Sequence, residues 1–210
     1  RMLRIALPLA FSAYARSALS TLEHLLVPRG LKSAGFSADR ALSGYGTIQG
    51  MVMPIISFPA CFLMALSELM IPELTEAQMR GESAEISHTV RSLLKKGSGY
   101  SLAVALAIFI FADRLGIAVY SSPEAGHFLR LLAPLIPIMY TDMLCDGCLK
   151  GLGQQMWNMG INVLDALLGV LLVWRVLPVY ALTGYICIIY FNECLNFALS
   201  MLRLGKVIRS

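Results

Sequence analysis

The chain has 210 residues, a net charge of +4 and a hydrophobic fraction of 57%, and only 14% of its residues are charged. Its mean hydropathy of +0.69 is too high for an ordinary soluble globular domain. The composition therefore excludes a water-soluble enzyme or binding module and predicts a protein embedded in a membrane, with membrane lipids as its surroundings and no nucleic-acid partner.

Apolar stretches follow one another along the whole chain, and each is close to or above the roughly 20 residues that a helix needs to cross the hydrocarbon layer. They predict an all-α, polytopic membrane protein with a single six-helix membrane lobe over residues 1–210. In chain order the six predicted spans are Met2 to Val27, Thr47 to Leu74, Tyr100 to Val119, Ala125 to Lys150, Met156 to Trp174, and Val179 to Leu202.

The first predicted span contains two charged residues, Arg16 and Glu23, which lie on nearly the same side because seven residues are close to two helical turns. A charge in mid-membrane costs about 2.5 kcal/mol or more when it faces lipid. We therefore expect Arg16 to face protein or a cavity. Two interpretations stay open: Arg16 binds an anionic substrate, since guanidinium matches phosphate oxygens, or it forms an internal ion pair with Glu23 or another acid.

The second and third spans are joined by residues 75–96, which we expect to form a cytoplasmic connecting segment. Ile86, Val90, Leu93 and Leu94 recur there at helical spacing, so the segment is interpreted either as a short amphipathic helix on the membrane surface or as a solvated linker. The positive-inside rule favours cytoplasmic termini, with the reversed orientation as the alternative. Cytoplasmic termini put ten basic residues inside (Arg1, Arg4, Arg80, Arg91, Lys95, Lys96, Lys150, Arg203, Lys206, Arg209) and six outside (Arg29, Lys32, Arg40, Arg114, Arg130, Arg175).

The fourth predicted span places Asp142, Asp146 and Lys150 four residues apart on one helical face. Asp146 and Lys150 lie near the inner end and are interpreted as a local ion pair. Asp142 is a turn deeper and is a candidate cavity residue, because ionisable groups inside a span are most often functional. The structure should therefore place Asp142 away from lipid.

The fifth span carries Asn158, Asn162 and Asp165 on one face. We interpret the asparagines as hydrogen-bonding links between helices, a common use of amides in membranes. Asp165 is a candidate cavity residue.

The five cysteines, Cys61, Cys145, Cys148, Cys187 and Cys194, all lie in apolar stretches and are interpreted as packing residues. No metal site and no cofactor are expected.

Several phrases of the sequence, in order, resemble one family of membrane transporters. They include RIALPLAFSAYARSALSTLEHLLVPRGL, ALSGYGTIQGMVMPIISFPA, LLAPLIPIMYTDMLCDGCLKGLGQQ and LPVYALTGYICIIYFNECLNFALSMLRL. Together they resemble the carboxy-terminal half of the multidrug/oligosaccharidyl-lipid/polysaccharide exporter superfamily, closest to its stage V sporulation protein B branch. The likeness covers nearly the whole chain.

The resemblance implies one lobe of a MATE-like transporter in a bacterial plasma membrane, without enzymatic activity. Such a lobe pairs with an amino-terminal lobe of the same protein, or with a second copy, around a central cavity. The implied substrate is a lipid-linked glycan with a diphosphate, such as a peptidoglycan precursor moved during spore cortex or cell-envelope formation. Arg16 and Glu23 would border the cavity, where Arg16 meets the diphosphate, while Asp142 and Asp165 tune its charge or couple ion movement.

Two other classes of protein remain as alternatives. An intramembrane, magnesium-dependent prenyl-diphosphate enzyme is suggested by the spacing of Asp142 and Asp146, although such enzymes need a second aspartate-rich motif and none is present. A non-transporting membrane assembly protein is suggested by a six-helix lobe without a partner lobe.

Overall fold

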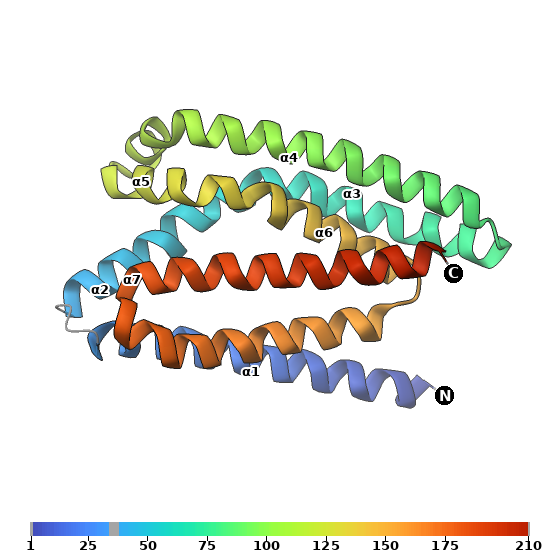
Figure 1. Ribbon diagram of the computed structural model, residues 1–210, viewed down its shortest axis with the longest axis horizontal. Helices are drawn as coiled ribbons and strands as arrows, with labels where there is room; N and C mark the ends of the chain where they lie inside the picture. The colour runs from blue at the N-terminus through green and yellow to red at the C-terminus, as the bar shows by residue number, and fades with distance from the viewer. Residues whose placement is uncertain (1, 34–37, 210) are drawn as a thin grey trace. The chain divides into compact units, whose positions relative to one another are not determined.

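The computed structural model describes residues 2–33 and 38–209, and all regular secondary structure in these ranges is helical (Figure 1). The predicted all-α class is therefore confirmed. The chain divides into two compact units. Unit 1 comprises the residues up to Tyr45 together with Gln155–Asn196, and unit 2 comprises Gly46–Gln154 together with the residues from Phe197 on.

Unit 1 is built from α1 (Met2–Ser33), most of α2 (Ala38–Thr47) and the first part of α7 (Gln155–Arg209). The helix α7 is interrupted at Ala181, whose backbone angles (φ 48°, ψ −133°) are not helical. Pro178 lies just before the break and lacks the N–H group that a continuous helix requires. The chain reverses direction at this point, so α7 is a hairpin of two helices (Figure 1).

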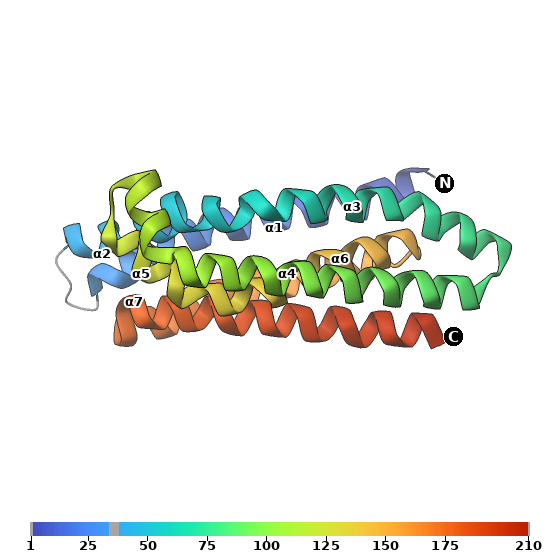
Figure 2. The ribbon, with the colours of Figure 1, turned by 90° about the horizontal axis from the view of Figure 1, so that it is seen from above.

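Unit 2 begins with a short π-helix, η1 (Ile48–Val52), which leads into α3 (Met53–Arg80). Gly81 then adopts a left-handed conformation (φ 73°), as glycine readily does at the end of a helix. The chain turns there into α4 (Ser83–Tyr120), and Figure 2 shows α3 and α4 running in opposite directions from this turn.

The rest of unit 2 consists of α5 (Pro123–Leu132), the single 3-10 turn η2 (Ala133–Leu135), α6 (Ile136–Gly151) and the end of α7. The Ser122 hydroxyl accepts a hydrogen bond from the Ala125 N–H and so caps α5. The 3-10 turn contains Pro134, and Pro137 lies in the first turn of α6. The prolines thus divide the fourth predicted span into two helices.

Glycines allow the helices of unit 2 to approach closely. A β-carbon at Gly116 of α4 would lie 2.5 Å from the Gly126 nitrogen of α5, and one at Gly151 of α6 would lie 3.0 Å from Leu74 Cβ of α3. At Gly147 an added β-carbon would overlap the Ser67 hydroxyl. Small residues at helix contacts are the usual means of association in membranes, where lipid is as apolar as the side chains.

Buried tyrosine hydroxyls also link the helices of unit 2. Tyr140 is 1% exposed, and its hydroxyl donates to the Ile56 carbonyl. Tyr100 donates to the Pro59 carbonyl at 3.1 Å. One acceptor belongs to Pro59 and the other lies three residues before it, so these bonds link α4 and α6 to a part of α3 that a proline makes irregular.

Four helical stretches are long and apolar enough to cross a membrane: Leu42–Arg80, Ser83–Tyr120, Pro123–Gly151 and Gln155–Ile208. They carry large exposed apolar side chains such as Phe58, Phe62 and Phe109, which suit a lipid environment. The protein is therefore a polytopic membrane protein. The arrangement of six spans in one lobe stays a prediction.

The predicted connecting segment 75–96 forms the end of α3, the turn at Gly81 and the first turns of α4. Its apolar residues Ile86, Val90 and Leu93 do lie at helical spacing, and all three are buried inside unit 2. This stripe therefore packs against protein. At 38 residues α4 is about 57 Å long, so part of it extends beyond the roughly 30 Å hydrocarbon layer.

Candidate functional site

Three of the predicted site residues come together in unit 1. Arg16 and Glu23 lie on α1, and Asp165 lies on the first part of α7. Asp165 interacts electrostatically with Glu23, which repels its negative charge, and with Arg16, which attracts it. Glu23 and Asp165 are half-buried, whereas Arg16 is exposed. Arg16 and Glu23, which were predicted to share one side of a helix, therefore have Asp165 from a distant part of the chain as a charged neighbour.

Arg16 lines a cavity of about 400 Å³ between α1 and α7. The lining combines one cation, two hydroxyl groups and one amide with apolar side chains. Its members are Ala13, Arg16, Ser17, Ser20, Met159, Asn162 and Val163. Guanidinium, hydroxyl and amide groups all donate hydrogen bonds, so the cavity has the chemistry needed to bind an oxyanion attached to an apolar molecule.

A second group of polar atoms surrounds Gly169 of α7. A β-carbon at Gly169 would lie 3.0 Å from Asn192 Nδ2 and 3.3 Å from Glu23 Oε2. The absence of a side chain there therefore lets α1 and both helices of the α7 hairpin converge. Within the described residues, the buried oxygens Asp165 Oδ1, Asn192 Oδ1 and Asn196 Oδ1 have no hydrogen-bond partner. Buried acceptors without a donor are rare, and they suit a site that takes up a proton, a cation, water or a ligand.

The two asparagines of the fifth predicted span are hydrogen-bonded to each other. Asn162 Nδ2 donates to the carbonyl of Asn158 at 2.9 Å and to its side-chain oxygen at 3.1 Å. These bonds join residues one turn apart in the same helix. Asn162 also lines the cavity. The role of the two asparagines in linking helices stays a prediction.

The predicted residues of the fourth span lie on α6, in unit 2. Asp142 is 6% exposed, so it is buried in protein as predicted. Asp146 is half-buried and accepts a hydrogen bond from Ser200 Oγ at 3.5 Å. Lys150 is exposed at the end of the helix. The expected ion pair between Asp146 and Lys150 stays a prediction, as does a common cavity for Asp142 with the residues of unit 1.

Sequence reasoning missed a polar contact next to Glu23. His24 Nδ1 and the Tyr45 hydroxyl are 2.6 Å apart and hydrogen-bonded. The Tyr45 ring meets the edge of the Tyr185 ring at a centroid distance of 5.4 Å. These residues come from three separate helices, and their positions in the sequence carry no signal of the contact.

The described part of the chain contains no group of three or more His, Cys, Asp or Glu side chains arranged to hold a metal ion. Cys145 and Cys148 are buried in unit 2, and Cys145 Sγ contacts Met201 Sδ at 3.3 Å. Their surroundings fit the predicted packing role.

Apolar helices that carry a cluster of charged and amide side chains are typical of a membrane protein with several spans. Residues 33–174 match the MatE family model, and the chain belongs to this family. The resemblance to the multidrug/oligosaccharidyl-lipid/polysaccharide exporter superfamily is therefore confirmed.

The chain is similar to two curated proteins of Bacillus subtilis (strain 168). It is 28% identical to "Sporulation protein YkvU" over 153 residues, which is 73% of this chain and 34% of that protein. It is 22% identical to "Stage V sporulation protein B" over 174 residues, which is 81% of this chain and 32% of that protein. The chain thus spans about a third of the length of these relatives. No solved structure matches it significantly.

Proposed function

We propose that the chain is one lobe of a bacterial flippase or exporter that moves a lipid-linked glycan across the plasma membrane. The substrate would be a lipid-linked oligosaccharide or peptidoglycan precursor, used in spore cortex or cell-envelope formation. The observation that carries the proposal is the cavity beside Arg16 in the apolar helices of a MatE family member. The similarity to two proteins named for sporulation supports the cellular role.

The lobe contains six membrane-spanning helices in this proposal. The break at Ala181 supports this count, because it divides α7 into residues 155–180 and 182–209, each longer than the roughly 20 residues of a span. The other four spans are α1, α3, α4 and the pair α5 and α6. A second lobe completes the transporter, either an amino-terminal lobe of the same protein or another copy. Both termini of the lobe face the cytoplasm.

The side chains of the unit 1 cavity have distinct roles in the proposed mechanism. Arg16 binds the diphosphate, because a guanidinium pairs with two phosphate oxygens at once. Ser17 and Ser20 add hydroxyl donors from the same helix, and the apolar residues accommodate the start of the lipid tail. The substrate is therefore bound where its charge has a partner inside the membrane.

The two acids near Arg16, Glu23 and Asp165, couple substrate transport to the uptake of a cation. Asp165 and Glu23 repel each other electrostatically, so uptake of a proton or another cation between them relieves this repulsion. The acceptor oxygens of Asn192 and Asn196 can take part in binding it. Asp142, which is buried in unit 2, has the proposed role of tuning the charge along the transport path. Binding and release of the cation then shift the equilibrium between inward-open and outward-open states.

The test replaces Arg16 with Ala and with Lys in the full-length protein. Flipping of a lipid-linked precursor in proteoliposomes should fall at least tenfold in the Ala variant, because a diphosphate then enters the membrane without its cation. The Lys variant should recover part of the rate by keeping the charge without the guanidinium geometry. Arg114→Ala is the control, because Arg114 is also exposed but lies outside the cavity. Unchanged flipping in Arg16→Ala would refute the role of Arg16.

A further inference from the structure

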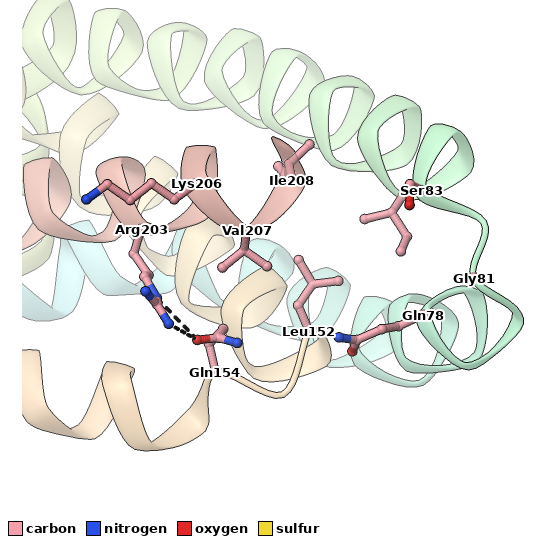
Figure 3. Close-up of a pocket in the computed structure, with 10 residues that line it drawn as sticks. Gln78, Gly81, Ser83, Leu152, Gln154, Arg203, Lys206, Val207 and Ile208 are labelled. Atoms are coloured by element: carbon pink, nitrogen blue, oxygen red, sulfur yellow. Dashed lines mark hydrogen bonds between the residues drawn. The ribbon is translucent and has the colours of Figure 1, made fainter. Parts of the chain in front are cut away.

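A second cavity of about 380 Å³ lies at one end of unit 2 and shares no lining residue with the cavity beside Arg16 (Figure 3). It is enclosed by the turn between α3 and α4, the connection from α6 to α7, and the last turns of α7. The lining residues are Gln78, Gly81, Ser83, Ile86, Leu152, Gln154, Arg203, Lys206, Val207 and Ile208. All of them belong to unit 2.

The charge of this cavity is positive. Arg203 and Lys206 contribute two cations, and none of the ten lining residues is an acid. Glu82 and Glu85 belong to the same turn and the start of α4, but they are exposed and do not line the cavity. An anion would therefore be attracted to it.

The guanidinium of Arg203 is held in place. Its Nε and Nη2 atoms donate to Gln154 Oε1 at 3.2 Å and 2.6 Å (Figure 3). Because glutamine is neutral, this contact orients the guanidinium without cancelling its charge. A pre-oriented guanidinium loses less entropy when it binds an oxyanion. Lys206 is exposed, and its flexible stem allows the ammonium group to move toward a bound anion.

The middle of the cavity is apolar. Leu152 and Val207 lie between the Arg203 end and the Ser83 end in Figure 3. A small inorganic anion would gain no binding free energy from these apolar side chains. A molecule with a phosphate group and an apolar part would contact both kinds of lining.

The cavity lies near the ends of two predicted membrane spans. The second predicted span ends at Leu74 and the fourth ends at Lys150. The Thr75 hydroxyl lies 2.8 Å from the carbonyl oxygens of both Ile71 and Gly151, so the two span ends are neighbours in unit 2. Gln154 follows Gly151 by three residues, and we therefore expect the cavity to lie at the level of the lipid headgroups that flank the hydrocarbon layer.

We propose that this cavity binds the phosphate headgroup of an anionic membrane lipid. Arg203 and Lys206 pair with the phosphate, while Leu152 and Val207 contact the glycerol and the first carbons of the acyl chains. Basic residues at the membrane surface attract anionic lipids in preference to zwitterionic ones. The site is independent of the transport function proposed above.

The test measures lipid binding to the purified full chain in detergent by isothermal titration calorimetry. The ligands are dihexanoyl phosphatidylglycerol, dihexanoyl phosphatidylcholine and inorganic phosphate. The double variant Arg203→Gln with Lys206→Gln should weaken phosphatidylglycerol binding at least tenfold. The matched control is Arg91→Gln with Lys95→Gln, which removes two exposed cations of α4 outside the cavity and should change the affinity less than twofold.

Three results would overturn the proposal. An equal loss of phosphatidylglycerol affinity in the two double variants would mean that the overall positive charge of the surface, and not this cavity, attracts the lipid. Equal affinity for phosphatidylcholine would exclude recognition of net charge, and displacement of phosphatidylglycerol by an equal concentration of inorganic phosphate would identify a site for soluble anions.

A second variant keeps the test decisive if the double variant does not fold. Lys206→Glu changes an exposed side chain and preserves the contact between Arg203 and Gln154. It should also weaken phosphatidylglycerol binding at least tenfold, because it reverses one of the two charges. Unchanged affinity in this variant, with a circular dichroism spectrum like that of the wild type, would contradict the proposal.

Discussion

Replacing Gly116 with alanine tests how closely α4 and α5 approach each other. The added β-carbon would lie 2.5 Å from the Gly126 nitrogen, 2.8 Å from the Ser122 carbonyl oxygen and 2.9 Å from Gly126 Cα. All three neighbours are backbone atoms, so no side chain can rotate away. The start of α5 must move instead, and this disturbs the hydrogen bond from the Ser122 N–H to the Gly116 carbonyl.

The expected loss of stability follows from two opposing effects. Overpacking of a close contact costs typically about 1–3 kcal/mol, and contact with backbone places this site near the upper end. Alanine recovers about 1 kcal/mol through its higher helix propensity. The net destabilisation is about 2 kcal/mol, which lowers the melting temperature by about 4–8 °C in a chain of this size.

The assay is thermal unfolding of the purified chain in detergent, followed by tryptophan fluorescence. Gly99→Ala is the matched control, because Gly99 lies on the same helix and an added β-carbon meets nothing within 4 Å. That variant should melt at or above the wild-type temperature. Gly126→Ala should be destabilised like Gly116→Ala, since its β-carbon would lie 2.8 Å from Asp113 Cα. A Gly116→Ala protein as stable as Gly99→Ala would refute the close packing of α4 and α5.

Three further substitutions test other features of the two units. Ala181→Gly should raise stability by about 1 kcal/mol in thermal unfolding, because glycine adopts the positive φ of 48° without strain; a lower melting temperature would contradict the break in α7. Tyr140→Phe should cost about 1 kcal/mol or more by leaving the buried Ile56 carbonyl without its donor, whereas an unchanged melting temperature would show that this bond contributes nothing. Arg130→Gln should cost less than about 1 kcal/mol, and less still at high salt, because the Arg130–Asp113 pair is exposed; a larger loss would mean that the pair is shielded from solvent.

The helical class and the membrane setting were predictable from the sequence, because a run of about 20 apolar residues is by itself enough to indicate a helix that crosses the hydrocarbon layer. The irregular parts of the helices contain residues that disfavour a regular α-helix, since Gly50 lies in the π-helix η1 and Pro134 lies in the 3-10 turn η2. The division of α7 was also predictable in its approximate position, because residues 175–178 separate the fifth and sixth predicted spans and the break lies at Ala181. The left-handed backbone conformation of Ala181 itself has no signal in the sequence, since alanine is otherwise a good helix former.

The site could be predicted only where its residues share a helix. The seven-residue spacing of Arg16 and Glu23 indicated a common side, but the contribution of Asp165 depends on how α1 packs against α7. The contact between Gln154 and Arg203 was not predictable, because 49 residues separate them and neither has an unusual local pattern. For the stripe that begins at Ile86, the helical spacing indicated an apolar face but not whether protein or lipid covers it.

The contact between α3 and α6 limits how these helices can slide. Ser67 Oγ bonds the Met143 carbonyl at 3.3 Å beside Gly147, and the next glycine, Gly151, lies one turn further along α6. A shift of one turn, about 5.4 Å, in one direction would bring Gly151 opposite Ser67. The same shift in the other direction would bring Met143 there, where a long side chain has no room. The packing of α3 against α6 therefore disfavours any shift of α6 that brings Met143 opposite Ser67.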